Sequence, residues 1–135
     1  MAQLRQDYQK FVDRDAEVVA VGPDSEQAFR EYWRKEELPF VGLADPTHTV
    51  AKRYGQEVRM LKLGRMPAQM VIDKAGRVAF MHYGGAMSDI APNAQILAIL
   101  DGLNQRISTF FDSEERFSED AVIPFILQFH DRSVL

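Results

Sequence analysis

The chain has 135 residues, of which 46% are apolar and 27% charged, so its size and composition are those of one globular domain. Its net charge is −4, and no basic stripe is present to neutralise phosphates, so we expect no nucleic-acid partner. No apolar run approaches the roughly 20 residues that span a bilayer, and we therefore expect a soluble, cytoplasmic protein without a membrane partner.

The first predicted element is an amphipathic helix, because Leu4, Tyr8, Phe11 and Val12 recur at helical spacing. A run of β-branched residues over positions 16–23 follows, and a Gly-Pro pair ends it. This pattern predicts a buried strand.

A second helix is predicted from Asp24, its expected N-cap, to about residue 35. Its aromatic residues stand at helical spacing, which indicates core packing more than a binding surface. A short extended stretch over 38–43 leads to a small helix over 47–54. Asp45 is the expected cap of this small helix, and Gly55 the expected C′ residue.

Two apolar runs, at 70–72 and 78–83, are joined by a tight turn in which Gly76 is available for a positive φ. They predict an antiparallel hairpin. A final long helix is expected to begin with Pro92 at N1 and to continue to residue 111. The alternation of helices and strands indicates an α/β domain with a central sheet.

Three stretches of this chain resemble the peroxiredoxin-like redoxins, the family named for alkyl hydroperoxide reductase and thiol-specific antioxidant. These stretches are LRQDYQKF, AEVVAVGPDSEQAFREYWRKEELPFVGLADPTHTVAKRYG and MPAQMVIDKAGRVAF, and the resemblance spans about residues 3–105. It implies a thioredoxin-like α/β sandwich with a central mixed sheet flanked by helices. We expect a redoxin domain over residues 1–111 and a C-terminal extension over residues 112–135.

The resemblance also implies a role for Pro67, which stands where thioredoxin folds place a cis-proline ahead of a core strand. The alternative is a trans proline that merely begins the strand. Peroxide-reducing members hold an arginine near this strand to stabilise a thiolate. Pro67 occupies that position here, and Arg65 could reach the same region or could be a solvated loop arginine.

In this family the catalytic cysteine lies on an N-terminal segment that also supplies the first core strand. The chain contains no cysteine, and its first residues already resemble the helix that follows that segment. We therefore expect the family activity, thiol-dependent reduction of peroxides or disulfides, to be lost, with no catalytic residue present. The alternative function is a non-catalytic module that binds a protein partner or its own copy.

The missing first strand would leave two unpaired strand edges, at 17–21 and 69–72, in the middle of the sheet. We consider three arrangements: a strand inserted by a second copy, direct pairing of the two edges, or return of the apolar residues 125–129 as the missing strand. For 125–129 both a strand and a terminal helix remain open. A homodimer, with or without exchanged strands, is the expected assembly.

No other motif predicts a cofactor or metal site, and we expect none. The three histidines, His48, His82 and His130, have no metal-binding spacing, and no phosphate-binding loop or serine-hydrolase motif is present. We interpret the histidines as ordinary surface or core residues, with His48 exposed, and Asp89 as a cap of the last helix.

Overall fold

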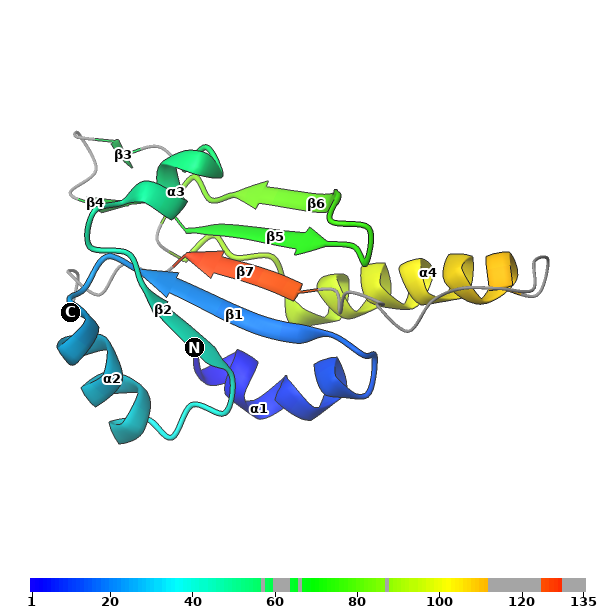
Figure 1. Cartoon of the computed structure of the whole chain (residues 1–135), viewed down its shortest axis with the longest axis horizontal. Helices are drawn as coiled ribbons and strands as arrows, with labels where there is room; N and C mark the ends of the chain where they lie inside the picture. Colours follow the sequence, from blue (N-terminus) through cyan, green and yellow to red (C-terminus); the bar gives the residue numbers. More distant parts are fainter. Residues whose placement is uncertain (57, 60–63, 66, 87, 112–124, 130–135) are drawn as a thin grey trace.

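The computed structural model describes residues 1–56, 58–59, 64–65, 67–86, 88–111 and 125–129, and their side chains except at 58–59, 64–65 and beyond 106. Figure 1 shows a mixed sheet of five strands in the order β2-β1-β7-β5-β6. These strands are β1 (Glu17–Gly22), β2 (Val41–Ala44), β5 (Ala68–Ile72), β6 (Val78–Tyr83) and β7 (Phe125–Phe129). A separate two-stranded sheet pairs β3 (Val58–Arg59) with β4 (Gly64–Arg65).

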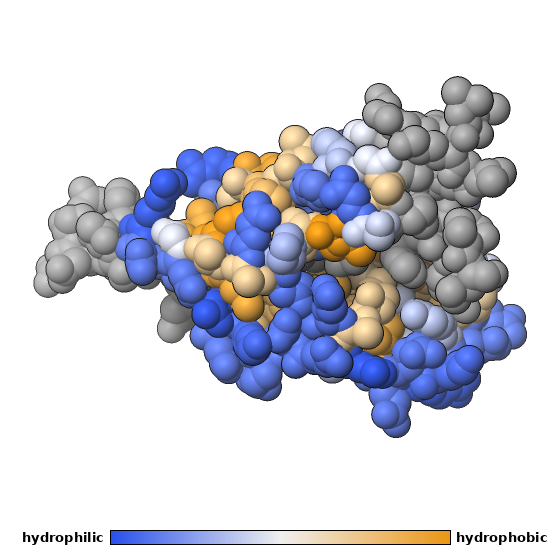
Figure 2. Space-filling view, turned by 180° about the vertical axis from the view of Figure 1, so that it is seen from behind, coloured by the Kyte–Doolittle hydropathy of each residue, from blue (hydrophilic) through white to orange (hydrophobic). Residues whose placement is uncertain are grey.

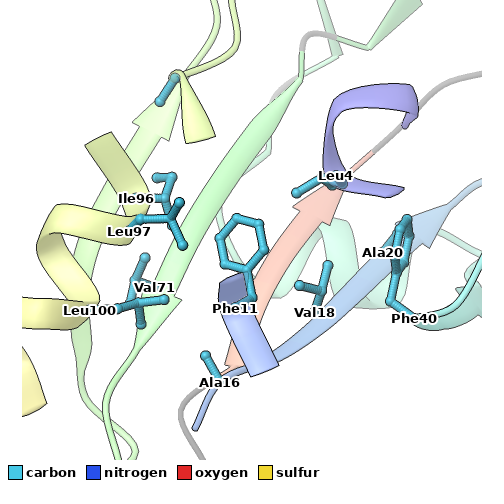
Figure 3. Packing of buried hydrophobic residues seen from close by; sticks show 11 residues of the cluster. Leu4, Phe11, Ala16, Val18, Ala20, Phe40, Val71, Ile96, Leu97 and Leu100 are labelled. Atoms are coloured by element: carbon cyan, nitrogen blue, oxygen red, sulfur yellow. The ribbon is translucent and has the colours of Figure 1, made fainter. Parts of the chain in front are cut away.

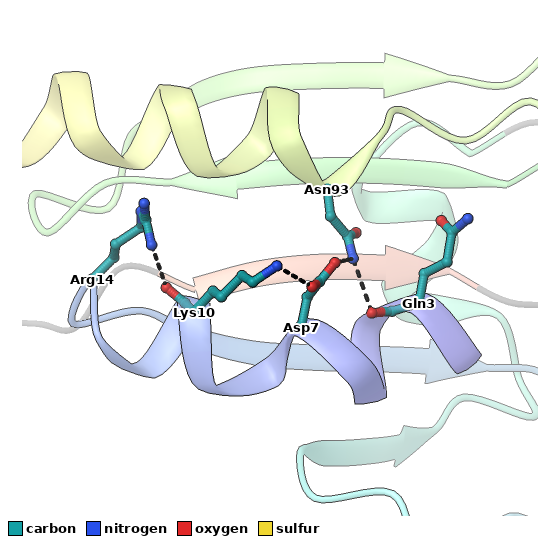
Figure 4. A network of polar contacts seen from close by, with 5 residues as sticks. All are labelled: Gln3, Asp7, Lys10, Arg14 and Asn93. Atoms are coloured by element: carbon teal, nitrogen blue, oxygen red, sulfur yellow. Dashed lines mark hydrogen bonds and ion pairs between the residues drawn. The ribbon is translucent and has the colours of Figure 1, made fainter.

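The helices are α1 (Ala2–Val12), α2 (Glu26–Lys35), α3 (Thr49–Arg53) and α4 (Asn93–Phe111). Figure 4 shows α1 and α4 side by side on one face of the sheet. Their N-terminal halves are joined by Asn93, whose Nδ2 donates to the carbonyl oxygen of Gln3 at 3.0 Å and to Asp7 Oδ2 at 2.9 Å. None of the helices in the described ranges is long and apolar enough to cross a membrane.

The predicted local signals agree with the structure at several turns. Gly76 has a φ of +79° in the β5–β6 turn, and Gly55 has a φ of +70° after α3. The predicted cap of α2 is wrong by one residue, because the hydroxyl of Ser25, and not Asp24, accepts from the N–H of Ala28 at 3.3 Å. Asp24 and Ser25 are both good N-cap residues, so the sequence alone did not separate them.

The centre of the sheet is β7, which the chain reaches last. It runs parallel to β1, with Glu17 opposite Phe125 and Val21 opposite Phe129. It runs antiparallel to β5, with Ala68 opposite Phe129. Residues 125–129 are thus a strand, in the position between β1 and β5 that the resemblance left open. The boundary between the two expected units, at residue 111, stays a prediction.

The main core lies between the sheet and the pair α1 and α4, and Figure 3 shows its side chains pointing toward one another. Phe11 of α1 and Leu100 of α4 are fully buried against Val18 and Val71 of the sheet. Burial of each large apolar side chain contributes about 1.5–3 kcal/mol. A smaller cluster on the other face consists of Val21, Ala51, Ala68, Met70 and Ile72.

Trp33 of α2 packs against the main core, as expected for the aromatic residues of this helix. Phe29 is buried, and its ring stacks on Trp33 with centroids 4.4 Å apart. A side chain at Gly42 of β2 would collide with both rings, so glycine at this position lets α2 approach the sheet. Figure 2 shows the side opposite to Figure 1, where hydrophilic residues border a region of hydrophobic ones.

Candidate functional site

The candidate site lies at the edge of the sheet where the parallel strands end. β1, β2 and β7 are parallel and end here at Gly22, Ala44 and Phe129. The antiparallel β5 begins at the same edge, directly after Pro67. The carboxyl ends of parallel strands are where ligands bind in α/β sheets. Figure 1 shows that α1 also begins toward this end of the sheet.

Pro67 is buried at this edge, between β4 and β5. Its carbonyl oxygen accepts from the N–H of Gly84 at 2.8 Å, which joins the beginning of β5 to the end of β6. A Cβ atom at Gly84 would lie 2.7 Å from Pro67 Cγ and 2.5 Å from the carbonyl oxygen of Asp89. Glycine is therefore required where the connection after β6 passes over the proline. Only the Gly84-Gly85 pair could have signalled this contact at the level of sequence.

The cis bond predicted ahead of Pro67 involves Met66, which lies outside the described residues, so the cis bond stays a prediction. Arg65 lies two residues before Pro67, in β4, where its backbone pairs with Val58. Its side chain is outside the described part, and its role toward an anion also stays a prediction. Of the two predicted site residues, the structure thus places Pro67 at the edge where β5 begins and the backbone of Arg65 in the separate β3–β4 sheet.

The connection after β6 is held by Asp89. One carboxylate oxygen of Asp89 lies 3.0 Å from His82 Nε2, and the other accepts from the N–H of Gly85 at 2.7 Å. These hydrogen bonds, the one from Gly85 first, lower the pKa of the Asp89 carboxyl. The predicted capping role of Asp89 is wrong, because α4 begins only at Asn93 and Asp89 binds the preceding loop instead.

The segment after β2 is held by Asp45, as expected. Its carboxylate accepts from the N–H groups of Thr49 at 2.9 Å and Ala51 at 3.0 Å, and its side chain is buried. The N–H of Asp45 also donates to the carbonyl oxygen of Gly22 at 2.7 Å, which joins the ends of β1 and β2. This cap therefore fixes α3 against the edge.

Two polar atoms near the ends of β1 and β2 are buried without a hydrogen-bond partner, Asp24 Oδ2 and His48 Nδ1. His48 is half-buried, and not exposed as predicted, because its ring packs with Nδ1 inaccessible to solvent; its backbone takes a left-handed conformation with a φ of 59° at the entry to α3. His130 lies outside the described residues. Among the side chains that are described, no group of three or more carboxylates and imidazoles could hold a metal ion.

The N-terminus of α1 is the feature of this edge that is best suited to an anion. No side chain caps α1, and no acidic residue stands in its first turn. The N–H groups of this turn therefore carry an uncompensated positive end of the helix dipole. Such an end stabilises a thiolate, but the chain of 135 residues contains no cysteine.

These features define an α/β protein with a mixed sheet and a helix without a side-chain cap near the carboxyl edge. The chain belongs to the AhpC/TSA family, whose model matches residues 1–81. It is 31% identical over 81 residues to peroxiredoxin Q, chloroplastic, of Oryza sativa subsp. japonica, a match that covers 58% of this chain and 36% of the relative. The resemblance found in the sequence is thereby confirmed.

Two further relatives agree. Peroxiredoxin Bcp of Bacillus subtilis (strain 168) is 30% identical over 84 residues, which cover 56% of this chain and 51% of the relative. Peroxiredoxin Q, chloroplastic, of Sedum lineare is 32% identical over 81 residues, which cover 58% of this chain and 42% of the relative. The chain thus spans between about a third and a half of the length of these relatives.

Proposed function

We propose that this chain is a thioredoxin-like scaffold of the peroxiredoxin type whose peroxide chemistry requires a thiol that its 135 residues do not supply. The observation that carries the proposal is the composition of the carboxyl edge. The end of β7, the uncapped beginning of α1 and Pro67 meet there, and the sequence holds no cysteine. The resemblance to the family assigns the thiolate to this same edge.

The chemistry explains why the missing thiol is decisive. In a thiol peroxidase, a thiolate attacks one oxygen of the peroxide; the O–O bond breaks, an alcohol or water leaves, and the sulfur becomes a sulfenic acid. A second thiol then reduces the sulfenic acid through a disulfide. The six methionines of this chain carry thioethers and cannot form a thiolate. The scaffold alone therefore lacks the nucleophile.

Peroxide consumption by the purified chain tests this proposal. With hydrogen peroxide and dithiothreitol as reductant, we expect the rate to equal that of a protein-free blank. A rate that rises in proportion to the concentration of pure protein would contradict the proposal, because it would require a nucleophile other than a cysteine thiolate.

A thiol introduced at the edge tests the electrostatic part of the proposal. Ala2 is exposed and begins α1, so the Ala2→Cys thiol should have a pKa about one unit below the usual 8.5. The matched control is Ala75→Cys, an exposed turn position whose N–H lies 3.0 Å from the Asp73 carboxylate. Ultraviolet titration of the two thiolates measures the difference. Equal pKa values would contradict an anion-stabilising edge.

The second candidate function is a non-catalytic binding module. Val41 and Leu43 of β2 and Met81 and Tyr83 of β6 are each 44–51% exposed and lie on the same face of the sheet. β2 and β6 are the two edge strands, so a protein that covers this whole face would bury the exposed apolar residues at both edges. If this face binds a protein or a second copy, Leu43→Lys with Met81→Lys should abolish that association without lowering stability. Association that survives both substitutions would contradict this candidate.

A further inference from the structure

The feature that carries the inference is the position of β7 in the sheet. β7 is the central strand, with neighbours on both sides, although it is the last element of the chain. Five residues of β7 stand opposite residues of β1, and the same five stand opposite residues of β5. The sheet is therefore continuous only when a strand fills the slot between β1 and β5.

Water cannot take the place of a strand in this slot. With β7 in place, Val18 and Ala20 of β1 are 0% exposed, Gln69, Met70 and Val71 of β5 are at most 1% exposed, and Glu17 and Val19 of β1 are half-buried. Backbone N–H and C=O groups left unpaired at such a place cost about 1–3 kcal/mol each. An empty slot is therefore a strong and specific acceptor for a strand of the β7 sequence.

In the structure the chain's own β7 fills the slot, but the number of residues before β7 would also allow it to reach the slot of a second copy. Residues 112–124, a stretch of 13, separate α4 from β7. Such a stretch can extend to about 45 Å, enough to reach a neighbouring molecule. Figure 1 shows the last turns of α4 projecting past the end of the sheet, while β7 lies in its middle. β7 pairs with β1 and β5 in the same register whether they belong to its own copy or to another.

We propose that the slot between β1 and β5 binds β7 of a second copy, so that the chain forms a reciprocal strand-exchanged dimer. A short linker gives the chain's own β7 an effective concentration in the millimolar range, so exchange requires chains that fold close together. Once formed, the dimer separates only if β7 leaves the centre of the sheet. Monomer and dimer should therefore coexist after expression and persist on dilution.

Because the chain contains no cysteine of its own, introduced cysteines can form disulfides only with one another. Val71 and Ile126 stand directly opposite each other across β5 and β7, at a separation that suits a disulfide. Full-length Val71→Cys and full-length Ile126→Cys chains, with different tags, are expressed together and then oxidised. Neither chain can form an internal disulfide. We expect a mixed disulfide of twice the 15.4 kDa chain mass in the dimer fraction.

Two controls make each outcome decisive. Ser88→Cys, exposed in the loop after β6, replaces Val71→Cys and gives the background of random collisions. The double variant Val71→Cys with Ile126→Cys shows that the pair can close. If the double variant closes, a mixed disulfide no more abundant than with Ser88→Cys overturns the proposal. If it does not close, or if a variant fails to fold, Val19→Cys with Leu127→Cys repeats the test from the β1 side.

Discussion

At the scale of single residues, we expect a glycine-to-alanine substitution to have opposite effects on stability at Gly84 and at Gly102. A Cβ at Gly84 would lie 2.5 Å from the Asp89 carbonyl oxygen, and backbone cannot move as a side-chain tip can. Gly84→Ala should therefore lower the free energy of unfolding by about 1–3 kcal/mol. Gly102 is an exposed residue of α4 with open space around it, so Gly102→Ala should raise it by about 0.5–1 kcal/mol.

Urea unfolding of both alanine variants beside the parent chain measures the two effects. A Gly84→Ala variant as stable as the parent chain would contradict the close approach of the β6 connection to Pro67. The Gly102→Ala variant shows that the assay detects a gain as well as a loss.

The lowered pKa of Asp89, in the loop after β6, predicts that the stability of the folded state depends on pH. The Gly85 N–H and His82 lower the pKa of its carboxyl in the folded state. The folded state then binds this proton less readily than the unfolded state, so the stabilisation is present above the unfolded pKa, about 3.9, and is lost as the pH falls through the folded value.

The Asp89→Asn variant isolates this contribution. The variant should be less stable than the parent chain at pH 7, and the difference should shrink as the pH is lowered below about 4. Urea unfolding of both proteins between pH 3 and pH 7 measures it. A difference that stays constant over this range would contradict the lowered pKa of Asp89.

At the scale of elements, two helix caps differ in burial and should differ in energy. Asp45 is buried and accepts two N–H groups of α3, whereas Ser25 is exposed and accepts one N–H of α2 at 3.3 Å. We expect Asp45→Ala to cost about 2 kcal/mol and Ser25→Ala about 0.5–1 kcal/mol. Thermal unfolding of the two variants measures the order. Equal losses would contradict the buried position of the Asp45 carboxylate.

The elements also show what the sequence could predict. The helical period of α1 and α4, the strand run of β1 and the turn before Gly76 are local patterns, and each was found from residues close together in the chain. The state of residues 125–129 could not be decided, because an apolar run of five fits a strand or a buried helix equally well. Its strand conformation depends on β1 and β5, which are distant in sequence.

The candidate site shows the same difference between features visible in the sequence and contacts that depend on tertiary structure. The resemblance to the family singled out Pro67 and Arg65, and their roles stay predictions. The contact of Gly84 with Pro67 and the binding of Asp89 to His82 and Gly85 arise where the β6 connection folds back over the strand edge. Such contacts depend on tertiary structure, which a local pattern of residue types does not contain.

At the scale of the whole molecule, the central strand of the sheet is β7, near the C-terminal end of the chain. The family match covers residues 1–81, and β7 lies outside it. The C-terminal residues therefore complete a sheet that the matched part leaves open between β1 and β5. The stability of the whole domain should depend on β7, since its removal unpairs both neighbours.

Amide hydrogen exchange of residues 125–129, followed by NMR, tests the central position of β7 most directly. A strand paired on both sides has its N–H groups bonded within the sheet, so exchange should require unfolding of the domain. We expect residues 125–129 to be as strongly protected as β1 and β5, and more strongly than the edge strand β2. Exchange of 125–129 within the range of unprotected amides would contradict the account.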